Sequence, residues 1–200
     1  MTFGKILSKR VALNPGDTAV VFEDRRYTYR ELDARTNKLA NALKSQGVKK
    51  GDRIGALMLN CSEFIDIYFA LAKLGAIMVP VNFRLAPPEV AYILGDSGAD
   101  MLFHGAEQSK AVDAIKGDIK GMKKIVPLGG EFEALLSSGD DGPVGEEVGM
   151  DDPQLILYTS GTTGVPKGAV LTHGNSVWNS INGIIDFGIR KEDITLVSAP

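Results

Sequence analysis

The chain has 200 residues, of which 44% are hydrophobic and 24% are charged, and its formal net charge is −3. A globular chain of this length buries roughly 70% of the surface that it exposes when unfolded, so it can build a sizeable core. Nucleic acids and anionic membranes attract proteins with a clustered basic excess, which this composition lacks. The one basic cluster is interrupted by acidic residues and is interpreted as a solvated face; it comprises Lys116, Lys120, Lys123 and Lys124 with Asp113 and Asp118 between them.

Cys61 is the only cysteine, which excludes an internal disulfide and a Cys-rich metal site. Because it lies beside an apolar run, we expect a buried structural thiol and not a nucleophile. The apolar segment at the N-terminus is too short for a signal peptide, and no apolar stretch is long enough to cross a membrane. We therefore expect a cytoplasmic protein. The sequence leaves the oligomeric state open, a homo-oligomer included.

The first half of the chain alternates between strand and helix patterns. Residues 18–29 predict two short strands joined by a charged turn at 23–25. A helix follows, with a capping box at Thr28 and Glu31 and a stop at Gly47; its expected core face is Leu32, Thr36, Leu39 and Leu43. Further strands are predicted at 52–59, 76–83, 99–104 and 123–128, and further helices at 60–75, 87–98 and 107–116.

These strands are apolar throughout and do not alternate with polar residues. Together with the repeated helices, this predicts an α/β fold in which a mainly parallel sheet is covered by helices on both faces. Residues 1–128 form this α/β part, residues 129–153 an acidic Gly-rich connection, and residues 154–200 a strand, a loop, a helix and a strand.

The connection at 129–153 contains no basic residue and has too few apolar residues to offset the entropy of ordering it. Residues 131–136 are compatible with a helical turn, and we interpret the rest as a mobile surface segment. A functional acidic patch is the alternative interpretation. After the connection, strands are predicted at 153–159, 168–173 and 193–200. A helix is predicted at 174–188, with Val177, Ile181, Ile184 and Ile185 at helical spacing.

The segment LYTSGTTGVPKG, at 157–168, combines small hydroxyl residues and glycines with one lysine. Backbone N–H groups converge on a phosphate only where the chain turns tightly without bulky side chains, and Gly161, Gly164 and Gly168 supply that freedom. Hydroxyl groups add donors, and a hydroxyl at Thr159 or Thr162 can also face a Mg²⁺ ion that bridges phosphate oxygens. The segment therefore predicts a phosphate-binding loop.

Electrostatics assigns most of the affinity to Lys167. A helix N-terminus gives an anion ~0.3–1 kcal/mol, whereas a lysine about 4 Å from a phosphate gives ~4 kcal/mol at an effective dielectric constant of about 20, before desolvation. The loop is not a Walker motif, because Pro166 precedes the lysine and Gly168 follows it. By composition alone, a flexible loop without function is the alternative.

The longer segment YTSGTTGVPKGAVLTHGN, at 158–175, resembles the signature loop of the adenylate-forming enzymes, which include acyl-CoA synthetases, firefly-type luciferases and peptide-synthetase adenylation domains. The resemblance extends upstream through residues 27–43, 51–60, 69–85 and 92–103. The segment VPVNFRL, at 79–85, is more similar to the acyl-CoA synthetase branch than to the peptide-synthetase branch, which usually has an acidic residue near that asparagine.

This resemblance implies an ATP- and Mg²⁺-dependent ligase in which a carboxylic acid, fatty or aromatic, becomes an acyl adenylate with release of pyrophosphate and passes to coenzyme A. The loop would hold the β- and γ-phosphates through hydroxyls of Thr159, Ser160, Thr162 and Thr163, amides of Gly161 and Gly164, and the charge of Lys167, which would also stabilise the departing pyrophosphate. His173 is expected to order the following turn and not to transfer protons, and Trp178 is expected in the core.

The resemblance also implies that the adenine and ribose contacts, a glutamate for magnesium, the acyl pocket and the main catalytic lysine of a C-terminal domain lie beyond Pro200. The chain is accordingly expected to be a truncated N-terminal part without activity of its own. The alternative, from another class, is a non-catalytic α/β module that binds a nucleotide or another phosphate.

Overall fold

The structure, a computed structural model, describes residues 1–159 and 165–197. Its helices are α1 (Phe3–Leu13), α2 (Tyr29–Ser45), α3 (Ser62–Leu74), α4 (Pro87–Asp96), η1 (Ala106–Gln108), α5 (Ser109–Ile115), α6 (Gly130–Ser137) and α7 (His173–Phe187). Its strands are β1 (Thr18–Phe22), β2 (Arg25–Thr28), β3 (Arg53–Leu57), β4 (Ile77–Pro80), β5 (Met101–His104), β6 (Lys124–Pro127), β7 (Pro153–Thr159) and β8 (Lys167–Thr172).

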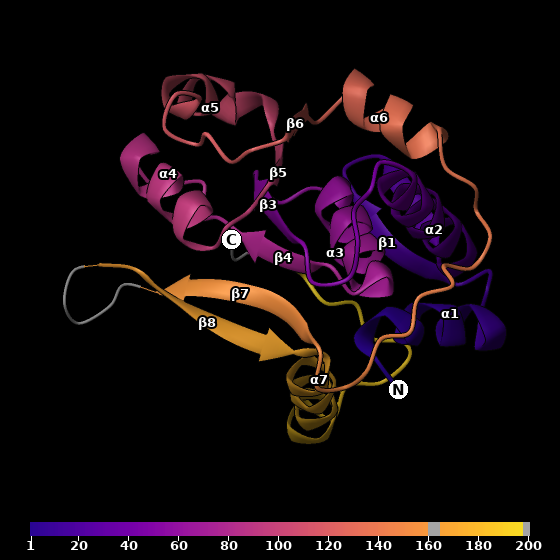
Figure 1. Cartoon of the computed structure of the whole chain (residues 1–200). Coiled ribbons are helices and arrows are strands. Elements are labelled where there is room, and N and C mark those ends of the chain that lie inside the picture. The colour runs from indigo at the N-terminus through magenta and orange to yellow at the C-terminus, as the bar shows by residue number, and fades with distance from the viewer. Residues whose placement is uncertain (160–164, 198–200) are drawn as a thin grey trace.

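Six of these strands form one sheet in the order β6-β5-β3-β4-β7-β8. The five strands from β6 to β7 are parallel, and only β8 runs antiparallel to its neighbour. Helices α4 and α5 cover one face, while α2, α3 and α6 lie on the other (Figure 1). The predicted α/β fold is therefore confirmed.

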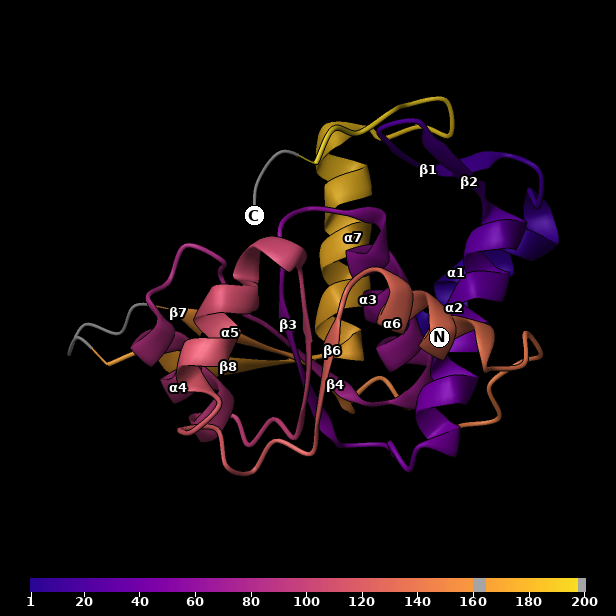
Figure 2. The same ribbon diagram turned by 90° about the horizontal axis from the view of Figure 1, so that it is seen from above.

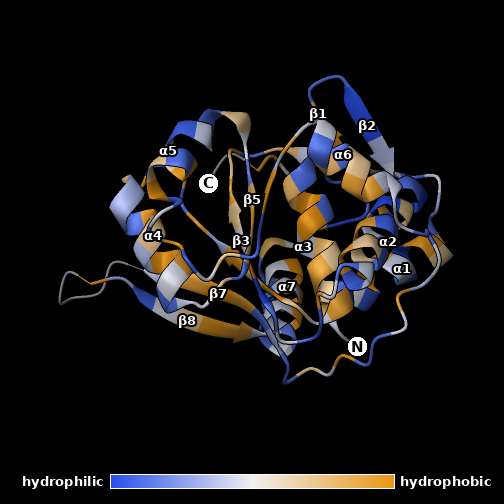
Figure 3. Cartoon of the chain, turned by 45° about the horizontal axis from the view of Figure 1, so that its top comes forward, coloured by the Kyte–Doolittle hydropathy of each residue, from blue (hydrophilic) through white to orange (hydrophobic). Residues whose placement is uncertain are grey.

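Alternate residues of the same strand enter two separate cores. Ile54 and Ala56 of β3 pack with α2, α3 and α6, whereas Leu57 packs with α4 and α5. A strand buried on both faces needs apolar side chains at successive positions, which explains the continuous apolar runs of the sequence. In Figure 3 much of α3 and of β7 accordingly has the hydrophobic colour.

The start and stop signals predicted for α2 are confirmed, as is the glycine stop of α3. Thr28 and Glu31 form the expected reciprocal capping box at the start of α2. Gly47 and Gly75 follow α2 and α3 with positive φ angles of 90° and 69°, a conformation that costs glycine little. The predicted core face of α2 is buried; it comprises Leu32, Thr36, Leu39 and Leu43. No helix in the described part of the chain is long and apolar enough to cross a bilayer.

Helix α1 was not predicted, because its pattern is weak and its support is tertiary. The Phe3 ring stacks on Phe69 of α3 at a centroid distance of 5.4 Å and meets Tyr68 edge-on at 5.1 Å. One turn is held against the α3 backbone at Gly4, where a Cβ would lie 2.7 Å from the carbonyl oxygen of Ala72. Close approach to α3 thus defines where α1 lies.

Two predictions near the C-terminal end of the described chain are wrong. Residues 193–197 form no strand, because no described strand pairs with them, and Ile194 and Leu196 are almost fully exposed. The chain after α7 passes β1 (Figure 2), and Lys191 in this segment forms an ion pair with Asp17. Trp178 is 62% exposed and not in the core, since α7 packs inward through His173 and Val177.

The acidic connection is partly structured. The expected helical turn at 131–136 is confirmed by α6, whose buried Phe132 meets the Phe103 ring edge-on at 5.9 Å. Residues 138–152 form neither helix nor strand, but the Asn41 side chain donates to the carbonyl oxygens of Asp140 and Gly142 at 2.8 and 3.0 Å. The mobility of this segment remains a prediction.

Several of the acidic charges in this connection have basic partners. Lys44 pairs with Glu146 at 2.5 Å, and Lys50 pairs with Asp152 at 2.5 Å. Charges that are paired within the chain are less available to a ligand, which favours the interpretation as a surface segment over that as a functional acidic patch.

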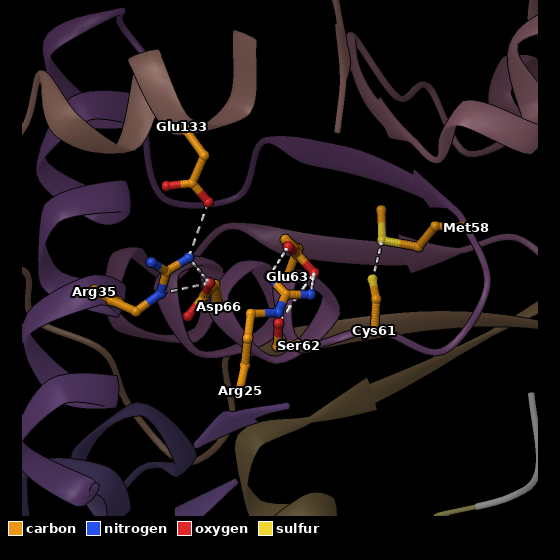
Figure 4. Close-up of polar contacts among 8 residues, drawn as sticks. All are labelled: Arg25, Arg35, Met58, Cys61, Ser62, Glu63, Asp66 and Glu133. Carbon is orange, nitrogen blue, oxygen red and sulfur yellow. Dashed lines mark hydrogen bonds and ion pairs between the residues drawn. The ribbon is translucent and has the colours of Figure 1, made fainter. Parts of the chain in front are cut away.

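Two arginines bind carboxylates of α3 in very different surroundings (Figure 4). Arg35 of α2 donates from Nε and Nη2 to Asp66 Oδ2 at 3.0 and 2.7 Å, and Asp66 is only 1% exposed. Arg25 of β2 donates to Glu63 at 2.6 Å, but its side chain is 41% exposed. The first pair links α2 to α3 inside the protein, and the second lies near its surface.

Replacing Arg35 with methionine should lower the free energy of unfolding by about 3 kcal/mol, because it leaves a buried carboxylate without a counter-charge. The matched variant Arg25→Met should cost less, about 1 kcal/mol, since the Arg25 side chain is 41% exposed and Glu63, at 13%, is more accessible to water than Asp66. Urea denaturation at pH 7 measures both, and equal losses would contradict the role of burial.

The Arg35→Met deficit should also depend on pH. Burial raises the pKa of Asp66 to about 6 even with Arg35 present, and loss of the guanidinium raises it further. Below that pH the folded carboxyl group is protonated and needs no counter-charge, so the deficit should shrink as the pH falls and grow as it rises.

Candidate nucleotide phosphate site

The two described ends of the predicted loop lie directly opposite each other. Thr159 is the last residue of β7 and Lys167 is the first residue of β8, and they are partners in the antiparallel register. Both are exposed, and Lys167 forms no ion pair with a described residue. The other predicted phosphate ligands lie outside the described residues; they are Ser160, Gly161, Thr162, Thr163 and Gly164. Their roles therefore remain predictions.

Strand pairing determines where these loop ends lie. β7 pairs in parallel with β4 through Leu155 and Met78, so its last residue comes at the carboxyl edge of the sheet. β8 returns antiparallel and begins at that same edge (Figure 1). After β8, Thr172 caps α7 by a reciprocal capping box with Asn175. Ligands of open α/β sheets bind outside the carboxyl ends of the strands, which is where the loop ends lie.

The interpretation of Gly168 as a source of backbone freedom is wrong. Gly168 lies within β8 and does not have a positive φ angle. A Cβ at this position would lie 2.8 Å from Ile156 Cγ2 and 3.0 Å from Tyr158 Cζ. The glycine therefore provides space for the Tyr158 ring, which faces it across the antiparallel register. We did not single out Tyr158 from the sequence, although a glycine opposite an aromatic residue in a predicted hairpin is a signal for such contact.

His173 is enclosed at the start of α7, with no exposed surface. Its backbone N–H donates to the carbonyl oxygen of Asp152 at 3.0 Å, while its ring nitrogens have no hydrogen-bond partner in the described part of the chain. Burial lowers the pKa of this histidine, so the ring is neutral near pH 7. The ordering role expected of His173 remains a prediction, because its one hydrogen bond to Asp152 is made by the backbone.

Cys61 was expected to be a buried thiol and is half-buried. Burial raises its pKa to about 11, so the group stays protonated, and its Sγ lies 3.8 Å from Met58 Sδ (Figure 4). It lines a cavity of about 360 Å³ beyond the carboxyl ends of β3 and β5, which also contacts Glu63 and Glu107. β4 separates β3 from β7 in the sheet, so this cavity is distinct from the loop ends.

The described residues alone do not form a metal site. Within the described ranges, no group of three or more His, Cys, Asp and Glu side chains is arranged to hold an ion. Mg²⁺ commonly keeps few protein ligands and is held largely by substrate phosphates. The hydroxyl of Thr159 fits that mode of binding.

Comparison with known proteins identifies relatives of the chain. The chain matches the family described as AMP-binding enzyme over residues 7–200. It is 41% identical over 192 residues to a feruloyl-CoA synthase of Amycolatopsis sp, covering 96% of this chain and 38% of that protein. It is 39% identical over 204 residues to the long-chain-fatty-acid–CoA ligase FadD13 of Mycobacterium tuberculosis, covering 98% of this chain and 40% of that ligase.

Solved structures show the same fold. The inhibitor-bound N-terminal domain of FACL13 from Mycobacterium tuberculosis matches with a TM-score of 0.83 and 38% identity, covering 90% of this chain and 47% of that one. An anthranilate CoA ligase, AuaEII, in complex with anthranoyl-AMP, matches with a TM-score of 0.82 and 32% identity. The match covers 86% of this chain and 35% of that one.

The chain therefore belongs to the family of AMP-binding enzymes. It spans about two fifths of the length of the curated relatives named above, 38% of one and 40% of the other.

Replacing Gly168 with alanine should destabilise the chain by about 1–3 kcal/mol, because the new methyl group would displace Ile156 or the Tyr158 ring. The matched variant Gly183→Ala, in α7, should stabilise it by about 0.5–1 kcal/mol, since a Cβ there meets nothing within 4 Å and alanine favours helix. Chemical denaturation measures both variants. The same sign of change in both would contradict the close approach at Gly168.

Proposed function

We propose that the protein containing this chain is an ATP-dependent acid–CoA ligase that works through an acyl adenylate. The observation that carries the proposal is the register of the β7–β8 hairpin. It sets the hydroxyl-bearing Thr159 opposite the lysine Lys167, both exposed at the carboxyl edge of the sheet. The connection between them contains the glycines and hydroxyl residues expected of a phosphate-binding loop.

In this proposal the loop binds the β- and γ-phosphates of ATP. Lys167 supplies positive charge near the β- and γ-phosphates, while backbone amides and hydroxyl groups from 159–164 set their orientation. Mg²⁺, when bound with the nucleotide, would screen the phosphate charge, and the Thr159 or Thr162 hydroxyl would face it. The lysine also favours departure of pyrophosphate, because negative charge builds up on the leaving group.

Two displacement steps account for the reaction. An oxygen of the substrate carboxylate attacks the α-phosphorus, the bond from that phosphorus to the bridging oxygen breaks, and pyrophosphate leaves with the bonding electrons. The thiol of coenzyme A then loses its proton and attacks the acyl carbon, and AMP leaves. The residues of this chain contribute to the first step, by positioning the phosphates and stabilising charge.

The proposed acid is aromatic or fatty. The relatives carry names of both kinds, feruloyl-CoA synthase and indoleacetate–CoA ligase on one side and long-chain-fatty-acid–CoA ligase on the other. We place the reaction in the cytoplasm. In the proposed arrangement this chain is the N-terminal part of the ligase, and the adenine contacts, the acyl pocket and a further catalytic lysine come from additional sequence. The span of about two fifths of each relative supports this arrangement.

Lys167→Ala in the full-length protein should weaken adenylation by about 1.5–3 kcal/mol, or roughly 10- to 150-fold in kcat/KM for ATP, through loss of charge-assisted hydrogen bonds. The control Lys120→Ala removes an exposed lysine shortly before β6, at the opposite edge of the sheet, and should leave the adenylation rate unchanged. Acid-dependent exchange of pyrophosphate into ATP, with ferulate and with a long-chain fatty acid, is the assay. An unchanged exchange rate for Lys167→Ala would contradict the role proposed for Lys167 in phosphate binding.

Titrating the 200-residue chain with ATP and with pyrophosphate separates the ligase from a non-catalytic phosphate-binding module. A ligase that takes its adenine and ribose contacts from further sequence should leave this chain with only weak affinity for either ligand. Tight, saturable binding of both ligands to this chain would instead favour the module. Calorimetry at fixed ionic strength gives the two dissociation constants.

A further inference from the structure

Helix α4 contacts the hairpin on both sides of the loop. The Tyr158 phenol, one residue before the end of β7, donates to Asp96 Oδ2 at 2.6 Å. The Tyr92 phenol donates to the carbonyl oxygen of Pro166, one residue before β8, at 3.4 Å. Tyr92 and Asp96 are four residues apart, so they lie on the same side of α4. One helix thus holds both ends of the loop.

The Tyr158 contact depends on two features of the hairpin. Ile156 and Tyr158 point to the same face of β7 and pack against the core formed with α4 and α5. Directly opposite, Gly168 leaves the space that the ring occupies. Burial, and then the nearby Asp96 carboxylate, raise the pKa of Tyr158, so the phenol stays protonated and keeps donating at neutral pH.

We propose that Tyr158 and Asp96 are positioning residues for the phosphate loop, with Tyr92 in support: by tying β7 and the start of β8 to α4, they hold Thr159 and Lys167 opposite each other before ATP binds. This inference rests on the proposed function. A binding site whose groups are already in position binds its ligand more tightly, because less ordering is needed when the ligand arrives. Loss of the contact therefore weakens ATP binding without changing the groups that touch ATP.

The test compares Tyr158→Phe, Asp96→Ala and the double variant in the full-length protein. Each single variant should raise the KM for ATP about fivefold, with the KM for the acid changed less than twofold. Because both changes remove one shared contact, the double variant should be no worse than about twice either single one. Tyr29→Phe is the control, since it removes a phenol from α2 on the other face of the sheet.

Three outcomes would overturn the inference. They are an unchanged KM for ATP in both single variants, equal rises in the KM values for ATP and for the acid, and a double variant whose loss is the product of the two single losses. Lys167→Ala, assayed in parallel, separates the two proposals. If Lys167→Ala impairs ATP use and the Tyr158 and Asp96 variants do not, the positioning role fails while the proposed function stands. If Lys167→Ala has no effect, the role proposed for Lys167 fails, and if the unaltered protein shows no acid-dependent exchange of pyrophosphate into ATP, the proposed function itself fails.

Discussion

The interaction on which the candidate site depends is the parallel pairing of β7 with β4, made at Leu155 and Met78. This pairing gives β7 the same direction as the other strands, so Thr159 comes at the edge where ligands of open α/β sheets bind. A short connection can only return antiparallel, and it therefore brings Lys167 back to the same edge. The direction of one strand thus fixes the position of the hydroxyl and of the charge.

Local chemistry made much of the fold predictable from the sequence. The capping box at Thr28 and Glu31 and the glycines that follow α2 and α3 act within one turn of their own residues, so their outcome hardly depends on the rest of the chain. Doubly buried strands require apolar side chains on both faces, and that requirement is visible at successive positions such as Ile54 to Leu57. Signals of this kind are complete within a short segment.

Features that rest on distant contacts were not predictable. Helix α1 is positioned by aromatic rings of α3 that lie more than sixty residues further along the chain. No pattern within residues 3–13 indicates these contacts. Apolar spacing in α7 and at 193–197 predicted burial or strand pairing, but a side chain is buried only where another element covers it. Gly168 was misread for the same reason, since the Tyr158 ring that requires it comes from the opposite strand. The hairpin that carries the candidate site was therefore predicted from the sequence, whereas its contacts with α4 were not.

Asp96 raises an electrostatic question, because its negative charge lies on the helix that supports a loop proposed to bind phosphate. A carboxylate accepts a hydrogen bond about twice as strong as a neutral acceptor does, so it holds the Tyr158 phenol firmly at 2.6 Å. Its repulsion of a more distant anion is weaker, because Asp96 is exposed and water and salt screen charges over such separations. An exposed aspartate can therefore hold the tyrosine through a strong hydrogen bond while repelling phosphate only weakly. A buried aspartate would repel the phosphate more strongly, because buried charges are screened less.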